Sequence, residues 1–204
     1  CALPISRQLP RRRPGLVDDV LAGLRGLYGV PAWRPRMDPV SELVTTILSQ
    51  NTSDINAERA FAALRARYAD WAAVEAAPVR SIAATIKSGG LAAQKAPRIK
   101  AALRATREHS GAYDLSFLAA MSPLEARDWL TAIPGIGPKT ASIVMLFCFG
   151  GPLMPVDTHV ERVSKRIGLL PPAASLQFAH DAWLELVEPA RMYEAHVALI
   201  DRKS

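Results

Sequence analysis

The chain has 204 residues, of which half are hydrophobic, and it carries a formal net charge of +6 with a sequence pI of about 9.7. No apolar run is long enough to cross a bilayer and no basic-then-apolar leader opens the chain, so we expect a cytoplasmic protein without membrane contact. Two cysteines exclude a disulfide scaffold and a four-cysteine metal site within these residues. The positive charge suits a polyanionic partner, although many basic proteins bind no nucleic acid.

Apolar residues recur at three- and four-residue spacing almost throughout, which predicts an all-α chain. The predicted helices are 15–29, 40–50, 54–68, 78–87, 94–109, 123–132, 138–149, 158–167, 175–187 and 190–201. At one start, Ser122 and Glu125 have the spacing of a capping box, with Pro123 at the first helical position. The arginines of segment 11–13 lie among prolines and predict a flexible arm.

A glycine-rich turn separates two of these helices. The first helix ends near Ala132 and the next begins at Pro138, with Gly135 and Gly137 between them. These glycines can adopt positive φ and admit a foreign backbone, and the amides that lead into the second helix can hold a phosphate. Because short glycine-rich turns also join helices that bind nothing, the turn alone leaves both interpretations open.

Two charged residues stand at helix starts. Lys139 lies in the first turn of its helix, where the macrodipole opposes a cation and favours the neutral amine, the form that attacks carbon. The alternatives are a solvated lysine or a phosphate-binding lysine. Asp157 has the position of an N-cap that accepts amides of residue 159 or 160. A capping carboxylate can also stabilise positive charge that develops on a sugar. His159 is expected to pack or to form hydrogen bonds, and Cys148 to lie in the core.

Residues 130–169 resemble the helix-hairpin-helix (HhH-GPD) DNA glycosylase superfamily, and in particular its endonuclease III-like branch. Two further segments are similar to that family in order along the chain. In Ser49–Asp54, either Gln50 or Asn51 matches the side chain that fills the gap left by the damaged nucleotide. In Ser88–Ala96, Leu91 matches the apolar wedge that enters between bases. An amide pair at a helix junction and a leucine that staples a helix are the structural alternatives.

The resemblance covers residues 15–201 and implies a two-lobed helical fold with DNA in the cleft between the lobes. Residues 32–151 would form a helical barrel that contains the helix-hairpin-helix at about 123–149. Residues 14–31 and 152–204 would form the second lobe. The basic residues of segment 95–107 would form a helix that either is solvated or follows the DNA backbone.

The activity implied is that of a bifunctional glycosylase and abasic-site lyase, a monomer acting on duplex DNA at the nucleoid of a prokaryote. Lys139 and Asp157 would be catalytic, and Gln50, Asn51, Leu91, Gly135, Gly137 and Thr140 would bind DNA. An oxidised pyrimidine is the expected base. The alternatives are another lesion, such as 8-oxoguanine or a mismatched or deaminated base, and a non-catalytic DNA-binding module.

Cofactors mark a departure from the family. Endonuclease III relatives hold a [4Fe–4S] cluster with four cysteines that this sequence lacks, so no cluster is expected in this chain. The start at Cys1 favours a truncated chain over a cluster-free branch. The family also suggests a monovalent cation on the hairpin carbonyls.

Overall fold

The structure is a computed structural model, and it describes residues 15–200. Within this range the chain is helical and contains no strand, which confirms the predicted fold class. The α-helices are α2 (Leu16–Tyr28), α3 (Pro39–Ser49), α4 (Asp54–Arg67), α5 (Trp71–Ala76), α6 (Val79–Thr85), α7 (Ala92–Ser110), α8 (Pro123–Thr131), α9 (Pro138–Phe149), α10 (Thr158–Arg166), α11 (Leu176–Leu186) and α12 (Met192–Ile200). None of the helices described here is long and apolar enough to span a membrane. The predicted arginine arm lies outside the described residues.

All ten predicted helices are present, and local capping explains several of their bounds. The Ser122 side chain accepts from the Glu125 amide and the Glu125 carboxylate accepts from the Ser122 amide, so the predicted capping box begins α8. Helix α5 was not predicted, because six residues are too few to show a helical period. Its start is fixed by the Asp70 carboxylate, which accepts from the Ala73 amide at 2.8 Å.

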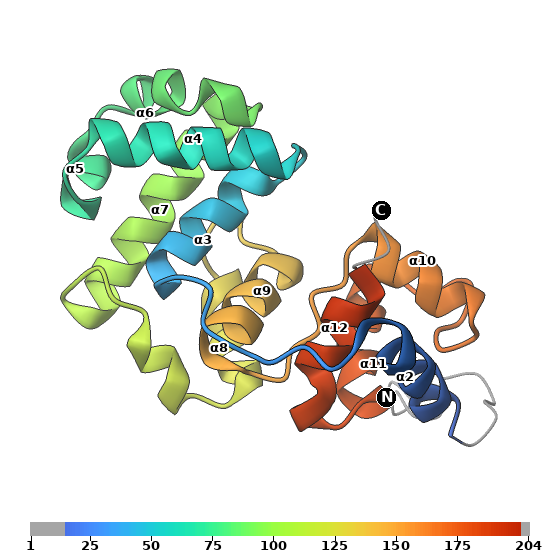
Figure 1. Cartoon of the computed structure of the whole chain (residues 1–204). Coiled ribbons are helices and arrows are strands. Elements are labelled where there is room, and N and C mark those ends of the chain that lie inside the picture. The colour runs from blue at the N-terminus through green and yellow to red at the C-terminus, as the bar shows by residue number, and fades with distance from the viewer. Residues whose placement is uncertain (1–14, 201–204) are drawn as a thin grey trace.

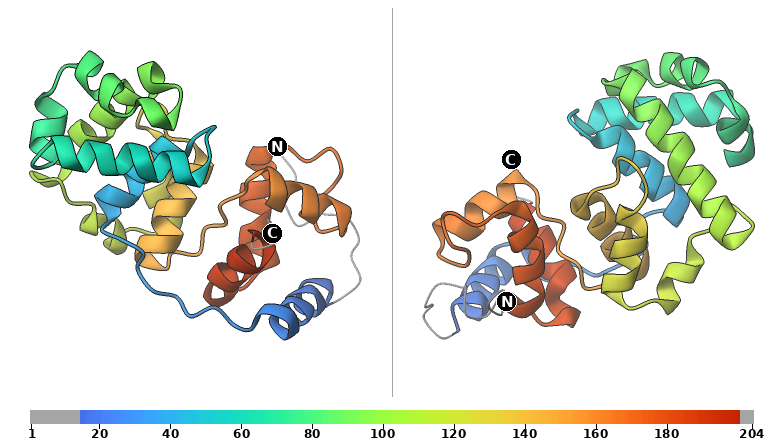
Figure 2. Two further views of the ribbon diagram at one scale, coloured as in Figure 1. Left: turned by 45° about the horizontal axis from the view of Figure 1, so that its top comes forward. Right: turned by 180° about the vertical axis from the view of Figure 1, so that it is seen from behind.

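The helices form two lobes that are joined by the segment between α2 and α3 and by the segment between α9 and α10 (Figures 1 and 2). Helices α3 to α9 form the first lobe, and α2, α10, α11 and α12 form the second. The N-terminal helix therefore packs with the C-terminal helices, and α2 contacts α12. Any ligand held between the lobes contacts parts of the chain that are far apart in sequence.

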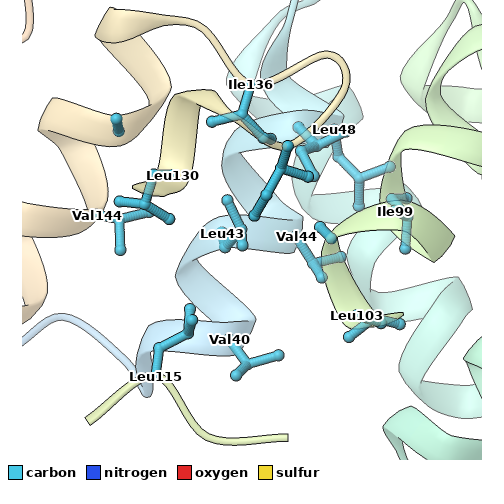
Figure 3. Close-up of a cluster of buried hydrophobic side chains, with 14 of the residues drawn as sticks. Val40, Leu43, Val44, Leu48, Ile99, Leu103, Leu115, Leu130, Ile136 and Val144 are labelled. Atoms are coloured by element: carbon cyan, nitrogen blue, oxygen red, sulfur yellow. The ribbon is translucent and has the colours of Figure 1, made fainter. Parts of the chain in front are cut away.

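The core of the first lobe is arranged around α3, which is buried on most of its faces. Figure 3 shows side chains of α3 among those of α7, α8 and α9. They include Val44, Leu48, Ile99, Leu103 and Val144, each with at most 1% of its surface exposed. Helix α3 is thus held rigidly, and its C-terminal end at Ser49 is a fixed point from which the next loop departs.

A second core fills the other lobe and is built around Trp183 of α11. Leu146 of α9 belongs to this second core, whereas Val144 of the same helix belongs to the first. Helix α9 therefore contributes to both cores, which explains why it is apolar around its circumference. Its N-terminus, with Lys139, is positioned by the packing of both lobes.

Candidate active site and nucleic-acid interface

The glycine-rich turn joins α8 and α9 as predicted, but its two glycines differ. Gly135 has a φ of +87°, the left-handed region that favours glycine. Gly137 has a φ of −99° and a ψ of 174°, which is extended backbone open to any residue. Gly135 therefore uses the positive φ that glycine permits, whereas Gly137 takes the ordinary extended geometry of an N-cap residue.

Contacts within the protein explain why glycine is needed at only one of these two positions. A Cβ atom on Gly135 would lie 2.5 Å from the Cγ and Cδ atoms of Arg98, so the arginine needs a glycine beneath it. A Cβ atom on Gly137 would have no atom within 4 Å. Neither strain nor crowding within the chain requires glycine at 137. The open space at the start of α9 is available to an external group.

Lys139 occupies the first turn of α9 and is exposed. No side chain caps this helix: its N-cap residue is Gly137, and Pro138 follows at the first helical position. The uncapped amides and the dipole together make this helix start attractive to an anion. Lys139 is therefore a cation at a helix end where an acid would be more stable.

Asp157 begins α10 and caps it, as the sequence predicted. Its Oδ1 atom accepts from the amides of His159 at 2.9 Å and Val160 at 2.8 Å. Within residues 15–200, the Oδ2 atom of Asp157 has no hydrogen-bond partner. One carboxylate oxygen thus holds the helix start, and the other is free to face a ligand.

The two charged residues come from different lobes and line the same cleft. A cavity of about 410 Å³ is lined by both of them and lies among α3, α4, α9 and α12. A second cavity, of about 540 Å³, is also lined by both and extends along the hairpin to α11. Its lining includes Asn51, Gly137 and His180. The structure thus brings Lys139 and Asp157 together with an open path toward the hairpin.

The first cavity has lining residues that the sequence did not reveal. They are Arg36, Met37, Thr45, Thr46, Ser49, Asp54, Ala57, Glu58, Ile143, Phe147, His196 and Ile200. The Arg36 guanidinium lies 5.1 Å from the Phe147 ring centroid, and the His196 ring meets Phe147 edge-on at 5.6 Å. Arg36 is also bonded to the fully buried carboxylate of Glu42. No local pattern marks these residues, because only tertiary packing collects them.

His196 is the most unusual of these residues. The residue is 4% exposed, and its Nδ1 atom is buried without a hydrogen-bond partner in the described structure. Burial lowers the pKa of His196 to about 4, an effect that Asp157 opposes and Lys139 reinforces. The imidazole is therefore neutral at physiological pH, although it lies within the electrostatic reach of both charged residues.

Gln50 and Asn51, which the sequence could not separate, have different surroundings. The Gln50 amide donates to the Gly135 carbonyl at 3.2 Å and to the Thr140 hydroxyl at 3.4 Å. Its carbonyl accepts from Arg98 at 2.8 Å. Asn51 is exposed with a φ of 53° and makes no side-chain hydrogen bond within the described range. Gln50 is thus committed to holding the hairpin, and Asn51 is free.

Thr140 and Leu91 also take distinct places. The Thr140 side chain is 5% exposed and is bonded by Gln50, so only its backbone amide can face a phosphate. Leu91 is 46% exposed and follows Gly90, and it precedes the first turn of α7 with a φ of 46°. Leu91 is thus an exposed leucine on a left-handed backbone, and its role as a wedge stays a prediction.

The basic residues of α7 have two kinds of surroundings. Lys95 is fully buried, and Lys100 donates to the Ala77 carbonyl. Arg107 forms a bidentate pair with Glu75 at 3.0 Å, and Arg104 lies 3.8 Å from the same carboxylate. Lys95 and Lys100 thus face protein acceptors because α7 packs centrally in the first lobe, whereas Arg104 and Arg107 keep 58% and 43% of their side-chain surface exposed.

The described residues do not fit an iron–sulfur cluster. Cys148 is the sole cysteine between residues 15 and 200, and burial raises the pKa of its thiol to about 12. Within the same range, no group of three or more His, Cys, Asp or Glu side chains could hold a metal ion. The monovalent cation on the hairpin stays a prediction. The hairpin carbonyls of Ile133 and Gly135 each accept a hydrogen bond from within the protein.

Comparison with known proteins agrees with this architecture. Residues 44–189 match the family described as HhH-GPD superfamily base excision DNA repair protein. The chain is 40% identical over 132 residues to a candidate DNA glycosylase of Arabidopsis thaliana, an alignment that covers 65% of this chain and 45% of that protein. It is 36% identical over 130 residues to endonuclease III of Sulfolobus acidocaldarius, covering 63% of this chain and 56% of that protein.

A solved structure of a non-covalent endonuclease III–DNA complex superposes with a TM-score of 0.75 at 24% identity, over 98% of this chain and 85% of that chain. The fold is therefore that of a two-lobed helical protein with a helix-hairpin-helix motif. The chain belongs to the HhH-GPD superfamily of base excision DNA repair proteins. It spans about half the length of the curated relatives it matches.

Proposed function

We propose that this chain is a bifunctional DNA glycosylase and abasic-site lyase that acts as a monomer on damaged duplex DNA. The observation that carries the proposal is the shared cleft, in which Lys139 of one lobe and Asp157 of the other line the same two cavities. A module that only bound DNA would need neither an amine nor a free carboxylate oxygen there. The similarity to endonuclease III supports the same activity.

The chemistry uses the two residues in sequence. Asp157 accepts a proton from Lys139 through its free Oδ2 atom, and the neutral amine attacks C1′ of the damaged nucleotide. The C1′–N bond breaks with its electrons leaving on the base, and the base takes the proton from Asp157. Asp157 is then again a carboxylate that stabilises positive charge on the sugar. The C1′–O4′ bond then breaks and O4′ takes a proton from the lysine nitrogen through the acid–base pair, which opens the sugar ring and leaves a C1′=N Schiff base that, once protonated, acidifies C2′. Loss of a C2′ proton then breaks the C3′–O bond and cuts the strand 3′ of the site.

Access to C1′ requires the nucleotide to leave the duplex, and three parts of the surface support this step. The uncapped start of α9 at Gly137 receives a backbone phosphate. Leu91 enters the stack as a wedge. Asn51, rather than Gln50, fills the vacated position, because Gln50 is bonded to the hairpin and Arg98.

An oxidised pyrimidine is the base that we propose, on the strength of the resemblance to the endonuclease III branch. The first cavity offers hydroxyls of Thr45 and Ser49 and carboxylates of Asp54 and Glu58, which suit a base with added polar groups. The other substrates are 8-oxoguanine and mismatched or deaminated bases. A panel of duplexes that each carry one of these bases, scored for base release, separates them.

Borohydride trapping tests the proposal. Because the Schiff base is a reducible covalent link, wild-type protein with an abasic or oxidised-pyrimidine duplex and borohydride should give a trapped band. Lys139→Gln should give none, since the amide cannot form an imine. Absence of the band from wild type, or equal trapping by Lys139→Gln, would overturn the lyase assignment. Salt-sensitive duplex binding with no lesion preference and no cleavage would identify a non-catalytic binding module instead.

A further inference from the structure

Lys95 is a lysine with no solvent-exposed surface, and it contacts both loops proposed to probe DNA. Its Nζ atom donates to the carbonyl of Leu48 at 2.6 Å and to the carbonyl of Gly89 at 2.6 Å. Its backbone amide donates to the carbonyl of Leu91 at 3.0 Å. One residue of α7 thus binds the end of α3 and both sides of Gly90.

The two carbonyls lie close in sequence to two unusual residues. Leu48 is three residues before Asn51, and Gly89 is two residues before Leu91. Among the described residues, Asn51 and Leu91 are the two non-glycine residues with positive φ, at 53° and 46°. Such backbone conformations are unfavourable and persist where surrounding contacts over-determine them. The contacts of Lys95 provide that restraint on both loops at once.

Local hydrogen bonds do not connect the two loops to each other. The first loop is closed by bonds from Gln50 to Ile47 and from Thr52 to Ser49, each 3.3 Å long. The second is closed by a bond from the Gly90 amide to the Lys87 carbonyl. Each of these bonds stays within its own loop, whereas the Lys95 side chain bridges from one loop to the other.

A buried amine is a costly way to fill a core position. Burial lowers the pKa of Lys95, and the Arg98 guanidinium lowers it further. An apolar side chain would pack there without this cost, but it would leave the Leu48 and Gly89 carbonyls without their donor. The amine therefore supplies two hydrogen bonds to backbone carbonyls that an apolar side chain could not supply.

We propose that Lys95 is a positioning residue that holds the Asn51 and Leu91 loops at a fixed separation, so that both side chains enter the duplex as one unit. The inference rests on the proposed function, in which Asn51 fills the gap and Leu91 acts as the wedge. Lys95 does not touch the reacting atoms. Its effect is on the distortion of DNA at a lesion and not on general affinity for DNA.

The first test is hydrogen exchange, which needs no enzymatic activity. In Lys95→Met, the amides of Gln50, Thr52 and Gly90 should exchange about tenfold faster, because loss of one bonding interaction is of that order. Lys100→Met is the matched control. It removes another lysine–carbonyl bond from the same helix, but that bond reaches Ala77, between α5 and α6. Faster exchange in only one of the two loops would overturn the proposal that Lys95 holds both loops together.

The second test measures lesion preference. The ratio of affinities for a duplex with a tetrahydrofuran abasic analogue and for the undamaged duplex should fall roughly tenfold in Lys95→Met and stay within about twofold in Lys100→Met. A fluorescent adenine analogue beside the lesion should report correspondingly less unstacking. The affinity for undamaged duplex should not change, whereas a misfolded variant would bind undamaged duplex more weakly too.

Failure of the inference and failure of the proposed function give different results. A folded Lys95→Met protein with wild-type exchange and wild-type lesion preference would overturn the inference. If Lys95→Met does not fold, Lys95→Gln takes its place, since its amide can still reach one carbonyl. If wild-type protein itself shows no lesion preference, the proposed function fails, whereas the exchange result still decides whether Lys95 ties the two loops.

Discussion

Two helix starts face the cleft, and they are built in opposite ways. Helix α10 is capped from within by Asp157, whose Oδ1 atom accepts two amides. Helix α9 has no side-chain cap, begins at Gly137 and Pro138, and places Lys139 in its first turn. An N-terminus attracts negative charge, so α10 supplies its own anion and α9 leaves that position open.

The difference suggests how one cleft can hold both phosphate and a cationic sugar. An uncapped start can receive an external phosphate, which would then supply the missing anion. A capped start presents a carboxylate with one spare oxygen, Oδ2 of Asp157, toward the sugar. Stability alone would favour a capping residue at both helices. The start of α9 leaves its amides open, as the proposed function requires, although α2, α6 and α7 also lack a side-chain cap. Substitutions at the starts of α9 and α10 test the distinction.

The largest effect is expected at the capped start. Asp157→Asn preserves the cap, because asparagine is an equally good N-cap residue, but it removes the negative charge. We expect lesion binding to be retained while single-turnover base release falls by roughly a thousandfold, the order seen when one electrostatic stabiliser is removed. The measurement is base release from a substrate duplex, with binding followed separately by fluorescence anisotropy.

A cap-breaking variant serves as the control for this prediction. Asp157→Ala loses both the charge and the two amide bonds, so its free energy of unfolding should fall by about 1 kcal/mol relative to Asp157→Asn. If Asp157→Asn retains base release to within tenfold of wild type, Asp157 is only a helix cap and the two helix starts do not differ in catalytic role.

Sequence reasoning predicted what local interactions determine. The ten helices depend on periodic patterns within single segments, and the capping box at Ser122 and the cap at Asp157 depend on residues within one turn of each other. All of them are present. The conformation of Gly137 could not be predicted, because glycine permits positive φ without requiring it. The six residues of α5 were too few to reveal a period.

The remainder of the site depends on contacts between distant segments. His196 lies next to Phe147 only when α12 packs on α9, and nothing near position 196 indicates this. Lys95 belongs to a run of basic residues that looks solvated until α7 is packed against the end of α3. The sequence likewise could not decide whether Gln50 or Asn51 probes the duplex, because the hydrogen bond that holds Gln50 comes from the distant hairpin.

His196 lines the same cavity as Lys139 and Asp157, and it gives a prediction about stability. Unfolded, its pKa is near 6.5, and burial lowers the folded value to about 4. Between these values the unfolded chain binds a proton that the folded chain does not, so the free energy of unfolding falls as pH falls. The contribution is absent above pH 6.5 and reaches about 3 kcal/mol of destabilisation near pH 4.

The variant His196→Gln isolates the pH-dependent contribution of His196 to the free energy of unfolding. Urea unfolding of wild type and variant at several pH values gives the difference in their free energies of unfolding, and any constant packing cost cancels in its pH dependence. The difference should move toward the variant's favour as pH falls from 6.5 to 4. His180, whose pKa burial also lowers, remains in both proteins and cancels too. A difference that does not vary with pH would show that His196 is accessible to protons in the folded state.

The smallest effect is expected at the uncapped start, from a pair of glycine substitutions. Gly137→Ala fits the extended backbone and meets no atom within 4 Å, so stability should change by less than about 0.5 kcal/mol. Its methyl group would occupy the space where a phosphate approaches, and affinity for an abasic-analogue duplex should fall roughly tenfold, a loss of about 1.4 kcal/mol. Fluorescence anisotropy at fixed salt measures the affinity, and denaturant unfolding measures the stability.

Gly135→Ala is the contrasting control. Its φ of +87° and the overlying Arg98 should make the alanine cost at least about 1–2 kcal/mol of stability. If Gly137→Ala binds the duplex as tightly as wild type, the start of α9 is not open for a phosphate, and the contrast with α10 concerns the protein's own stability alone.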